Sequence, residues 1–290
     1  MDAIIFGWVV IGNILSFLLI LPICLKLKDN SLVDIGWAMS FVSMVWIAFL
    51  LNGFRNQSWS PVQILISCLV AIWGIRLIIY ITVRKVIRGK GEDVRFVKYR
   101  ESWKKFFALK TLLIIFVPQM VMTYIIGFSA VFANTVTDLS SVNSLDIILL
   151  SIGSFIWLLG FLFETVGDIQ LLKFRNNPSN KGKTLNTGVW KYSRHPNYFG
   201  ETTQWWGIFI LALSLAIKYR ADLATIIVGC VAILSPFTIT FLLLKVSGIG
   251  LLEKTVLEER AGYKEYVATT SPFIPWFPKK IKNSAKTIKK

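Results

Sequence analysis

The chain has 290 residues, of which 54% are hydrophobic, and its formal net charge at pH 7 is +16. Soluble domains are about 45–50% apolar, whereas the apolar runs here reach the roughly 20 residues that a helix needs to cross a bilayer. The composition therefore excludes a soluble domain and predicts an all-α, polytopic membrane protein. The basic residues lie between the apolar runs, so they indicate membrane topology rather than nucleic-acid binding.

Seven membrane-spanning helices are predicted. The first apolar run has no basic n-region and no small-residue cleavage site, so we expect a retained helix rather than a signal peptide. The fourth is long and contains Pro118, which predicts a tilt or a kink, and Pro236 lies inside the seventh. The predicted spans cover about residues 3–25, 32–51, 61–83, 106–133, 145–170, 198–217 and 223–245.

Positive charge is divided unequally between the two ends of these spans. The connections after spans one, three and five and the tail from residue 245 hold 28 of the 32 Lys and Arg residues, if Lys110 is counted with the third connection. The other connections hold 3, and Arg76 lies inside a span. Because Lys-rich and Arg-rich loops stay in the cytoplasm, we expect the N-terminus outside and the C-terminus in the cytoplasm. In a bacterium the membrane would be the inner, or plasma, membrane.

Two common kinds of soluble-protein site find no support. Cys24, Cys68 and Cys230 lie singly in apolar runs without metal-type spacing, so we interpret them as core residues and predict no metal site. There is no glycine-rich fingerprint that follows a strand, so a Rossmann site is not predicted.

The densest group of polar residues lies between residues 164 and 201, where the fifth span ends and the sixth begins. Glu164 and Asp168 are four residues apart and share one helix face, where like charges repel unless a cation, water or a polar ligand compensates. Ionisable groups inside a membrane are candidate functional residues. We expect both carboxyls to accept hydrogen bonds from a ligand, with Arg175 positioned to bind a phosphate. The alternative is that both are solvated at the headgroup level.

A second polar group surrounds Pro196 at the start of the sixth span. A proline at a helix start is pre-organised, and the free N–H groups of the first turn favour an anion. A carboxyl one turn inside the apolar run can serve as an acid or base. The alternative is an interfacial helix cap with a structural histidine. The candidate residues are Arg194, His195, Asn197, Tyr198 and Glu201.

Earlier spans add fewer candidates. Asp34 in the second span and Arg76 in the third could pair across helices. Tyr80, four residues after Arg76, could present its phenol to a substrate carbonyl, or it could belong to the interfacial aromatic belt. In the third connection, Glu92 and Asp93 with Arg95 either fold over the cytoplasmic mouth or remain solvated.

These residues together resemble a known family. The stretch 164–201 resembles the C-terminal half of the membrane steroid 5-alpha-reductases, especially their bacterial relatives. The resemblance extends over roughly residues 34–278. It also rests on Gly89–Asp93 with Arg95 and Phe96, on Leu251–Lys254, on Gly262–Tyr266 and on Ser271–Pro275.

The resemblance implies a cytoplasm-facing NADPH site and reduction of a carbon–carbon double bond conjugated to a ketone in a lipophilic substrate. It implies one membrane domain, with helices of residues 1–133 on the substrate side, residues 145–278 on the cofactor side, and a basic tail from residue 279. Asp168, Arg175, Asn197 and Glu201 match cofactor-binding positions, whereas Glu164 replaces an amide-type residue. Arg194, His195 and Tyr198 complete the predicted cofactor-binding set.

The catalytic assignment follows from the same resemblance. In the steroid enzymes a Tyr and a Glu on early helices polarise the ketone; the candidates here are Tyr80 and Asp34, with Glu201 as a further acid or base. The rival interpretation is a membrane methyltransferase of the isoprenylcysteine carboxyl type, which binds S-adenosylmethionine. It shares the Arg-His-Pro-x-Tyr signature and an acidic segment, here Glu258-Glu259. A transporter would predict paired broken helices or repeats, and the sequence has none. No oligomeric state is predicted.

Overall fold

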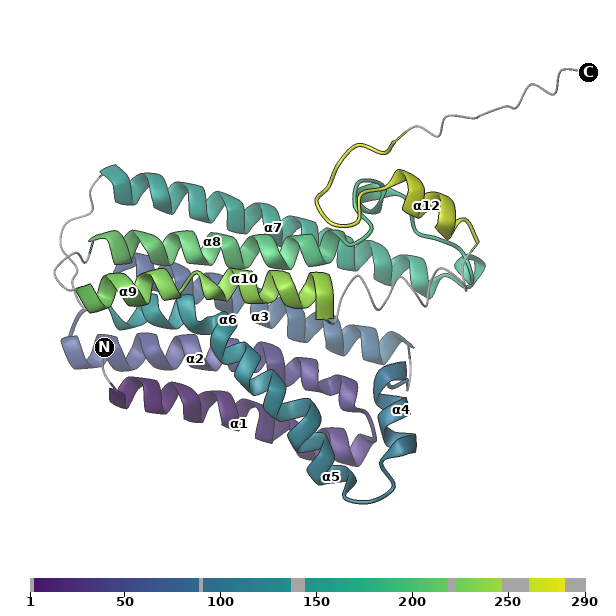
Figure 1. The fold of residues 1–290 in the computed structure, drawn as a ribbon, viewed down its shortest axis with the longest axis horizontal. Helices are drawn as coiled ribbons and strands as arrows, with labels where there is room; N and C mark the ends of the chain where they lie inside the picture. The colour runs from purple at the N-terminus through teal and green to yellow at the C-terminus, as the bar shows by residue number, and fades with distance from the viewer. Residues whose placement is uncertain (1–2, 89–90, 137–143, 219–222, 247–260, 280–290) are drawn as a thin grey trace, which may run out of the picture. The chain divides into compact units, whose positions relative to one another are not determined.

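The computed structural model describes residues 3–88, 91–136, 144–218, 223–246 and 261–279. These ranges contain helices and connections but no strand, which confirms the predicted all-α fold. The helices, which Figure 1 labels, are α1 (Ala3–Leu27), α2 (Val33–Asn56), α3 (Pro61–Arg88), α4 (Val94–Ser102), α5 (Phe107–Lys110), α6 (Val117–Thr135), α7 (Ser144–Asn176), α8 (Pro196–Lys218), α9 (Leu223–Val231), α10 (Leu234–Phe241) and α12 (Tyr263–Thr269).

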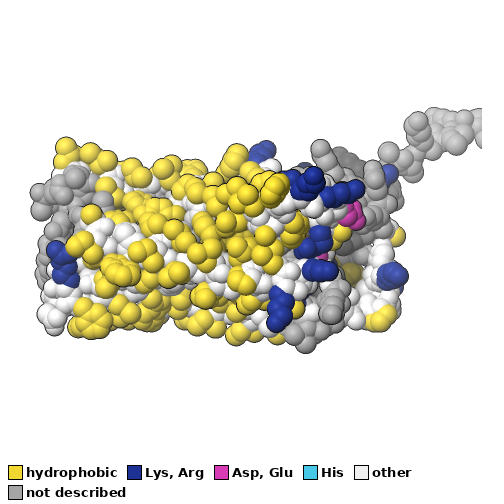
Figure 2. All heavy atoms as spheres, turned by 90° about the horizontal axis from the view of Figure 1, so that it is seen from below, with side chains coloured by type: hydrophobic (Ala, Val, Ile, Leu, Met, Phe, Trp, Pro, Cys, Tyr) yellow, Lys and Arg dark blue, Asp and Glu magenta, His cyan; other side chains and the backbone are white. Residues whose placement is uncertain are grey.

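Six helical segments in the described ranges are long and apolar enough to cross a membrane. The chain is therefore an integral membrane protein, and Figure 2 shows the broad hydrophobic face that lipid would contact, with Lys and Arg gathered toward one end. The sequence predicts seven spans, and the difference is α8, whose first turns carry the polar run 201–204. The six segments are Ala3–Leu27, Asn30–Asn56, Pro61–Lys85, Phe107–Thr135, Ser144–Asn176 and Ile226–Val246.

The chain divides into two compact units. Unit 1 comprises Met1–Leu158 and Thr203–Thr240, and unit 2 comprises Leu159–Thr202 and Phe241–Lys290. Helices α7 and α8 are therefore each divided between the two units. The division predicted from the sequence, between residues 133 and 145, is a division by role and stays a prediction.

Helix α2 is the centre of unit 1, where it packs against α1, α3 and α6. A hydrogen-bonded group of side chains joins three of these helices. The Ser40 hydroxyl donates to Asn13 Oδ1 at 2.9 Å and lies 3.1 Å from Thr123 Oγ1, and Asn13 Nδ2 donates to the Met120 carbonyl at 2.8 Å. Such interhelical bonds satisfy polar groups that hydrocarbon cannot.

Prolines coincide with two irregularities in the described spans, and a third, the π-helical turn Leu242–Val246, ends the last span. Pro118 follows a π-helical turn, Thr111–Phe116, which confirms the predicted disturbance of the fourth span. Pro236 follows the break at residues 232–233, where α9 ends and α10 begins. A proline removes one helical N–H and its ring clashes with the carbonyl four residues earlier, so the helix must loosen before it.

The connection between α3 and α4 folds onto the turn between α1 and α2, within unit 1. The Glu92 carboxylate pairs with Arg100 through two bonds of 2.8 and 2.9 Å, and it accepts the Asn30 backbone N–H at 2.7 Å. The Asp93 N–H donates to Ser31 Oγ at 2.8 Å. The connection is therefore held against the α1–α2 turn. Its predicted position over the cytoplasmic mouth stays a prediction, and residues 89 and 90 lie outside the described ranges.

Asp93 also caps α4. Its carboxylate accepts the Arg95 N–H at 3.0 Å and pairs with the Arg95 guanidinium. Burial by itself would raise the pKa of Asp93, but the hydrogen bonds from the Arg95 side chain and backbone outweigh it and hold that pKa below its usual range. The hydrogen bonds that Arg100 donates to the Glu92 carboxylate raise the pKa of Arg100 above its usual range.

Candidate functional site

Within unit 2, the end of α7 and the first turn of α8 approach each other at backbone distance. A Cβ placed on Gly200 would lie 2.4 Å from the Glu164 nitrogen and 2.5 Å from the Gly160 carbonyl oxygen. A Cβ on Gly167 would lie 3.3 Å from the Asn197 nitrogen. The missing side chain of Gly200 allows this contact, which brings the two polar groups of the 164–201 stretch together.

Two carboxylates of α7 are buried beside this contact. Glu164 is 3% exposed and Asp168 is 4% exposed. Asn197 donates from Nδ2 to Asp168 Oδ1 at 3.2 Å. The alternative that both carboxyls are solvated is therefore wrong, because the fold of unit 2 encloses them. A buried carboxylate is stable only with donors around it, so this is a site where acceptors are concentrated.

The segment before α8 is held by the chain that follows α12. Arg194 donates from Nη1 to the carbonyls of Val267 and Thr270, at 2.8 and 3.2 Å, and its N–H donates to the Ser271 carbonyl at 2.9 Å. The Ser193 hydroxyl donates to the Phe273 carbonyl at 2.7 Å. Arg194 thus fixes the C-terminal segment of unit 2; its predicted place at a cofactor phosphate stays a prediction.

The remaining predicted cofactor-binding residues also lie in unit 2. The rings of His195 and Tyr198 stack with 5.4 Å between their centres, and His195 is 7% exposed. Glu201 is partly buried one turn into α8, and Arg175 is exposed at the end of α7.

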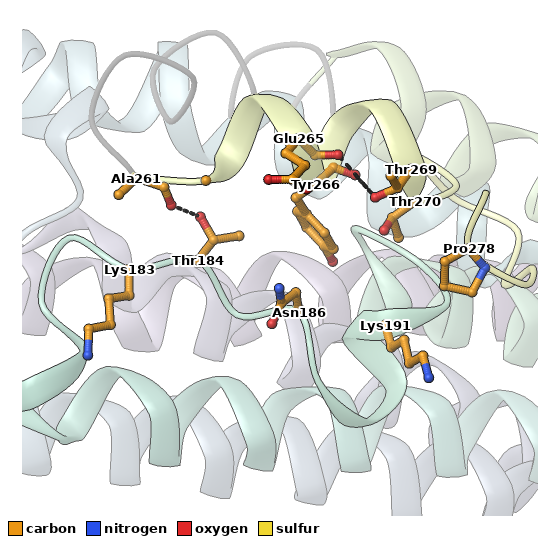
Figure 3. Close-up of a pocket in the computed structure, with 11 residues that line it drawn as sticks. Lys183, Thr184, Asn186, Lys191, Ala261, Glu265, Tyr266, Thr269, Thr270 and Pro278 are labelled. Atoms are coloured by element: carbon orange, nitrogen blue, oxygen red, sulfur yellow. Dashed lines mark hydrogen bonds between the residues drawn. The ribbon is translucent and has the colours of Figure 1, made fainter. Parts of the chain in front are cut away.

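A pocket of about 490 Å³ lies between the 183–191 connection and α12, wholly within unit 2. Figure 3 shows the Asn186 side chain beneath α12, with the Tyr266 ring pointing toward it and Lys183 and Lys191 on either side. The hydroxyls of Thr184 and Thr269 already donate to the carbonyls of Ala261 and Glu265. The groups left to meet a ligand are thus chiefly lysine ammonium groups, the Asn186 amide and the Glu265 carboxylate.

The predicted catalytic residues of the early helices lie in unit 1. The Arg84 guanidinium is 5.7 Å from the centre of the Tyr80 ring. Arg84 also exerts the strongest attraction on the Asp34 carboxyl, followed by Arg95. Arg84 therefore lies near both candidates, and the predicted pairing of Asp34 with Arg76 stays a prediction. The sequence indicates the proximity of Arg84 to Tyr80, because the two are four residues apart on the same helix face.

Sequence reasoning missed an aromatic cluster in unit 1. The ring of Trp73 lies 5.4 Å from that of Trp205 and 5.3 Å from that of Phe41. Trp73 and Trp205 are each 2% exposed, and their indole N–H groups have no hydrogen-bond partner among the described residues. Buried indoles usually find a partner, so these two N–H groups are exceptions among the described residues. Single tryptophans in apolar runs give no such signal in the sequence.

Comparison with known protein families matches residues 20–270 to DUF1295, described as a protein of unknown function. The chain belongs to the DUF1295 family. No curated protein and no solved structure matches it. The match covers the second to seventh predicted spans and both parts of the candidate site. The acidic segment 258–259 and Leu251–Lys254 lie outside the described residues. Membership of the steroid 5-alpha-reductases stays a resemblance in these motifs.

Proposed function

We propose that this DUF1295 protein is an NADPH-dependent reductase that acts on a carbon–carbon double bond conjugated to a ketone in a lipophilic substrate. The observation that carries the proposal is the enclosure of Glu164 and Asp168 at the start of α8, where Asn197 contacts Asp168. Acceptors and an amide at one buried position suit the ribose hydroxyls and the carboxamide of a dinucleotide.

The charges of unit 2 also fit such a cofactor. Arg175 is exposed, and Lys183 and Lys191 line the neighbouring pocket, so cations are available for phosphate groups. When bound, NADPH supplies a hydride. The contribution of this chain is to hold the dinucleotide and to orient it through Asp168, Asn197 and Glu201.

Unit 1 offers the groups that the substrate requires. Reduction of an enone places negative charge on the ketone oxygen, and a hydrogen-bond donor at that oxygen lowers the barrier. The indole N–H groups of Trp73 and Trp205 are buried donors, and the Tyr80 phenol is a third candidate. The surrounding aromatic rings suit a lipophilic molecule and keep water away from the reacting atoms.

The test is thermal unfolding of the purified chain in detergent with NADPH, NADH or S-adenosylmethionine. A ligand that binds only the folded state raises the unfolding temperature. We expect stabilisation by NADPH that is lost in Arg175→Ala and Glu201→Gln. Arg55→Ala and Glu101→Gln are matched controls, since both native side chains are exposed and lie outside the candidate site.

Stabilisation by S-adenosylmethionine instead of NADPH would contradict the reductase and support the methyltransferase interpretation of the Arg-His-Pro-x-Tyr signature. Equal losses in the control variants would show that the effect reports damage to the fold rather than a cofactor site.

A further inference from the structure

Unit 2 exposes an apolar edge that no membrane span explains. Ile274, Trp276 and Phe277 are 61, 70 and 76% exposed, and they lie in the segment after α12, outside every candidate span of the described residues. We call these three residues the aromatic edge. Side chains of this size on a soluble surface are normally covered, so the edge requires a partner.

The backbone of the aromatic edge is fixed. The Trp276 N–H donates to the Tyr192 carbonyl at 2.9 Å, and the Lys279 N–H donates to the Thr269 carbonyl at 2.8 Å. On the inner side, the Phe273 ring lies 5.8 Å from that of Phe199. The exposed side chains are therefore presented by a segment that is hydrogen-bonded to the rest of unit 2.

Cations flank the aromatic edge. The Lys191 ammonium is 5.9 Å from the centre of the Tyr192 ring. The centres of the Tyr192 and Phe277 rings are 5.9 Å apart. Lys279 is exposed next to the edge, and the last twelve residues of the sequence contain six lysines. Tryptophan beside lysine is the combination that favours the headgroup region of a bilayer, where indole rings and ammonium groups both find partners.

We infer that the aromatic edge is an interfacial anchor that inserts into the headgroup region of an anionic lipid leaflet. An anionic surface attracts the flanking lysines, whereas a second copy of this chain would bring the same lysines against each other. The protein is already membrane-embedded, and the charge asymmetry predicts that this end faces the cytoplasm, where anionic lipids are concentrated. The anchor would hold the C-terminal segment, and with it Arg194, against the membrane surface.

The test places an environment-sensitive fluorescent label on Phe277→Cys in the full-length chain, reconstituted in nanodiscs. Cys68 and Cys230 are replaced by alanine, and Cys24 is buried. We expect a blue-shifted emission and a loss of emission with lipids that carry a nitroxide near the headgroup. Both effects should be larger with phosphatidylglycerol than with phosphatidylcholine alone. A label on Ile274→Cys should behave in the same way, which guards against an effect of losing the Phe277 ring.

Two variants test the charge argument. Lys279→Gln should reduce the response to phosphatidylglycerol, whereas Lys264→Gln, on the exposed surface of α12, should not. An emission typical of water and insensitive to nitroxide lipids would overturn the proposal. So would a blue shift that ignores nitroxide lipids but appears only when two chains share a disc, because the edge would then be covered by a second copy.

Discussion

At the scale of single residues, Gly200 decides whether α7 and α8 can form the site. A methyl group at this position would overlap the backbone of Glu164 and Gly160, and backbone cannot move aside as a side chain does. We expect Gly200→Ala to destabilise the protein by about 1–3 kcal/mol or more and to abolish stabilisation by NADPH. Thermal unfolding in detergent, with and without NADPH, measures both effects.

The matched control is Gly7→Ala. Gly7 is also helical, but nothing lies within 4 Å of an added Cβ there, and alanine is the better helix former. This variant should be as stable as the wild type or more so. A Gly200→Ala protein that unfolds at the temperature of the control would contradict the close approach of the two helices.

The bond from Asn197 to Asp168 permits a second prediction. Asn197→Ala removes the donor and leaves a buried carboxylate short of one partner, which costs about 1–3 kcal/mol. The exchange of the two residues, Asp168→Asn with Asn197→Asp, keeps one amide and one carboxylate at the same contact. We expect the exchange to recover stability that Asn197→Ala loses, as measured by chemical unfolding. Equal instability of both variants would mean that the bond matters less than the identity of each residue.

The sequence predicts these residues because charge in an apolar run is conspicuous. Glu164 and Asp168 stand out for that reason, and Asn197 belongs to the polar run at the start of the next span. The partners of Arg194 do not stand out, since the Val267 carbonyl that it contacts lies 73 residues away and is a backbone atom. The indole donors of Trp73 and Trp205 are equally hidden, because only burial distinguishes them from ordinary apolar residues.

At the scale of elements, the N-terminal cap of α4 depends on a carboxylate and therefore on pH. The pKa of Asp93 is held below its usual value, about 3.9 in the unfolded chain. A lowered pKa gives stability that is complete above the unfolded value and is lost as the pH falls through the folded value. We expect the first turn of α4 to stay capped at pH 5 and to fray below about pH 4, where the carboxylate that accepts the Arg95 N–H becomes protonated. Hydrogen exchange of the α4 amides measures the fraying.

The control for this prediction is Asp93→Asn, which can still cap the helix but cannot ionise. Its α4 amides should exchange faster at pH 5 and show a smaller change on acidification. A pH dependence equal to that of the wild type would show that Asp93 is not the group responsible, and would point to Glu92 and its bond with Arg100.

The pocket beneath α12 gives a prediction about the cofactor. Lys183 lines it and is exposed, and NADPH differs from NADH by one phosphate, which a lysine recognises as a point charge. Lys183→Ala should weaken stabilisation by NADPH more than stabilisation by NADH. Lys98→Ala, an exposed lysine of α4 in unit 1, is the control. Equal losses of stabilisation by NADPH and by NADH in Lys183→Ala would show that Lys183 does not bind the additional phosphate of NADPH.

Elements as a whole are predicted better than their details. The apolar runs locate each span because a bilayer demands about 20 residues of one character. Helix α8 is predicted as a span from the sequence, yet its polar first turns keep it from the six strongly apolar segments. Polar residues are tolerated in α8 because they face protein rather than lipid: Thr202 and Gln204 are 4 and 2% exposed.

At the scale of the whole molecule, the number of crossings fixes the sides of the termini. Six crossings would leave both ends on one side, whereas seven separate them, as the distribution of Lys and Arg requires. Within unit 1, a Cβ on Gly207 of α8 would lie 2.7 Å from the Gly153 carbonyl oxygen of α7, so α8 runs directly beside a spanning helix. We therefore predict that α8 crosses the membrane.

Reporter fusions test this topology. A fluorescent protein at the C-terminus should fold and fluoresce in the cytoplasm, and an alkaline phosphatase at the N-terminus should be active outside. Cytoplasmic signals from both ends would contradict a crossing by α8 and would also remove the basis for a cytoplasmic site.

The central claim is that NADPH binds where α7 meets α8, and hydrogen exchange of the full-length chain with and without NADPH tests it most directly. The account predicts slower exchange in peptides that cover residues 164–175 and 181–201 when NADPH is present, with no such change for S-adenosylmethionine. Unchanged exchange with NADPH, or protection of the same peptides by S-adenosylmethionine alone, would contradict it.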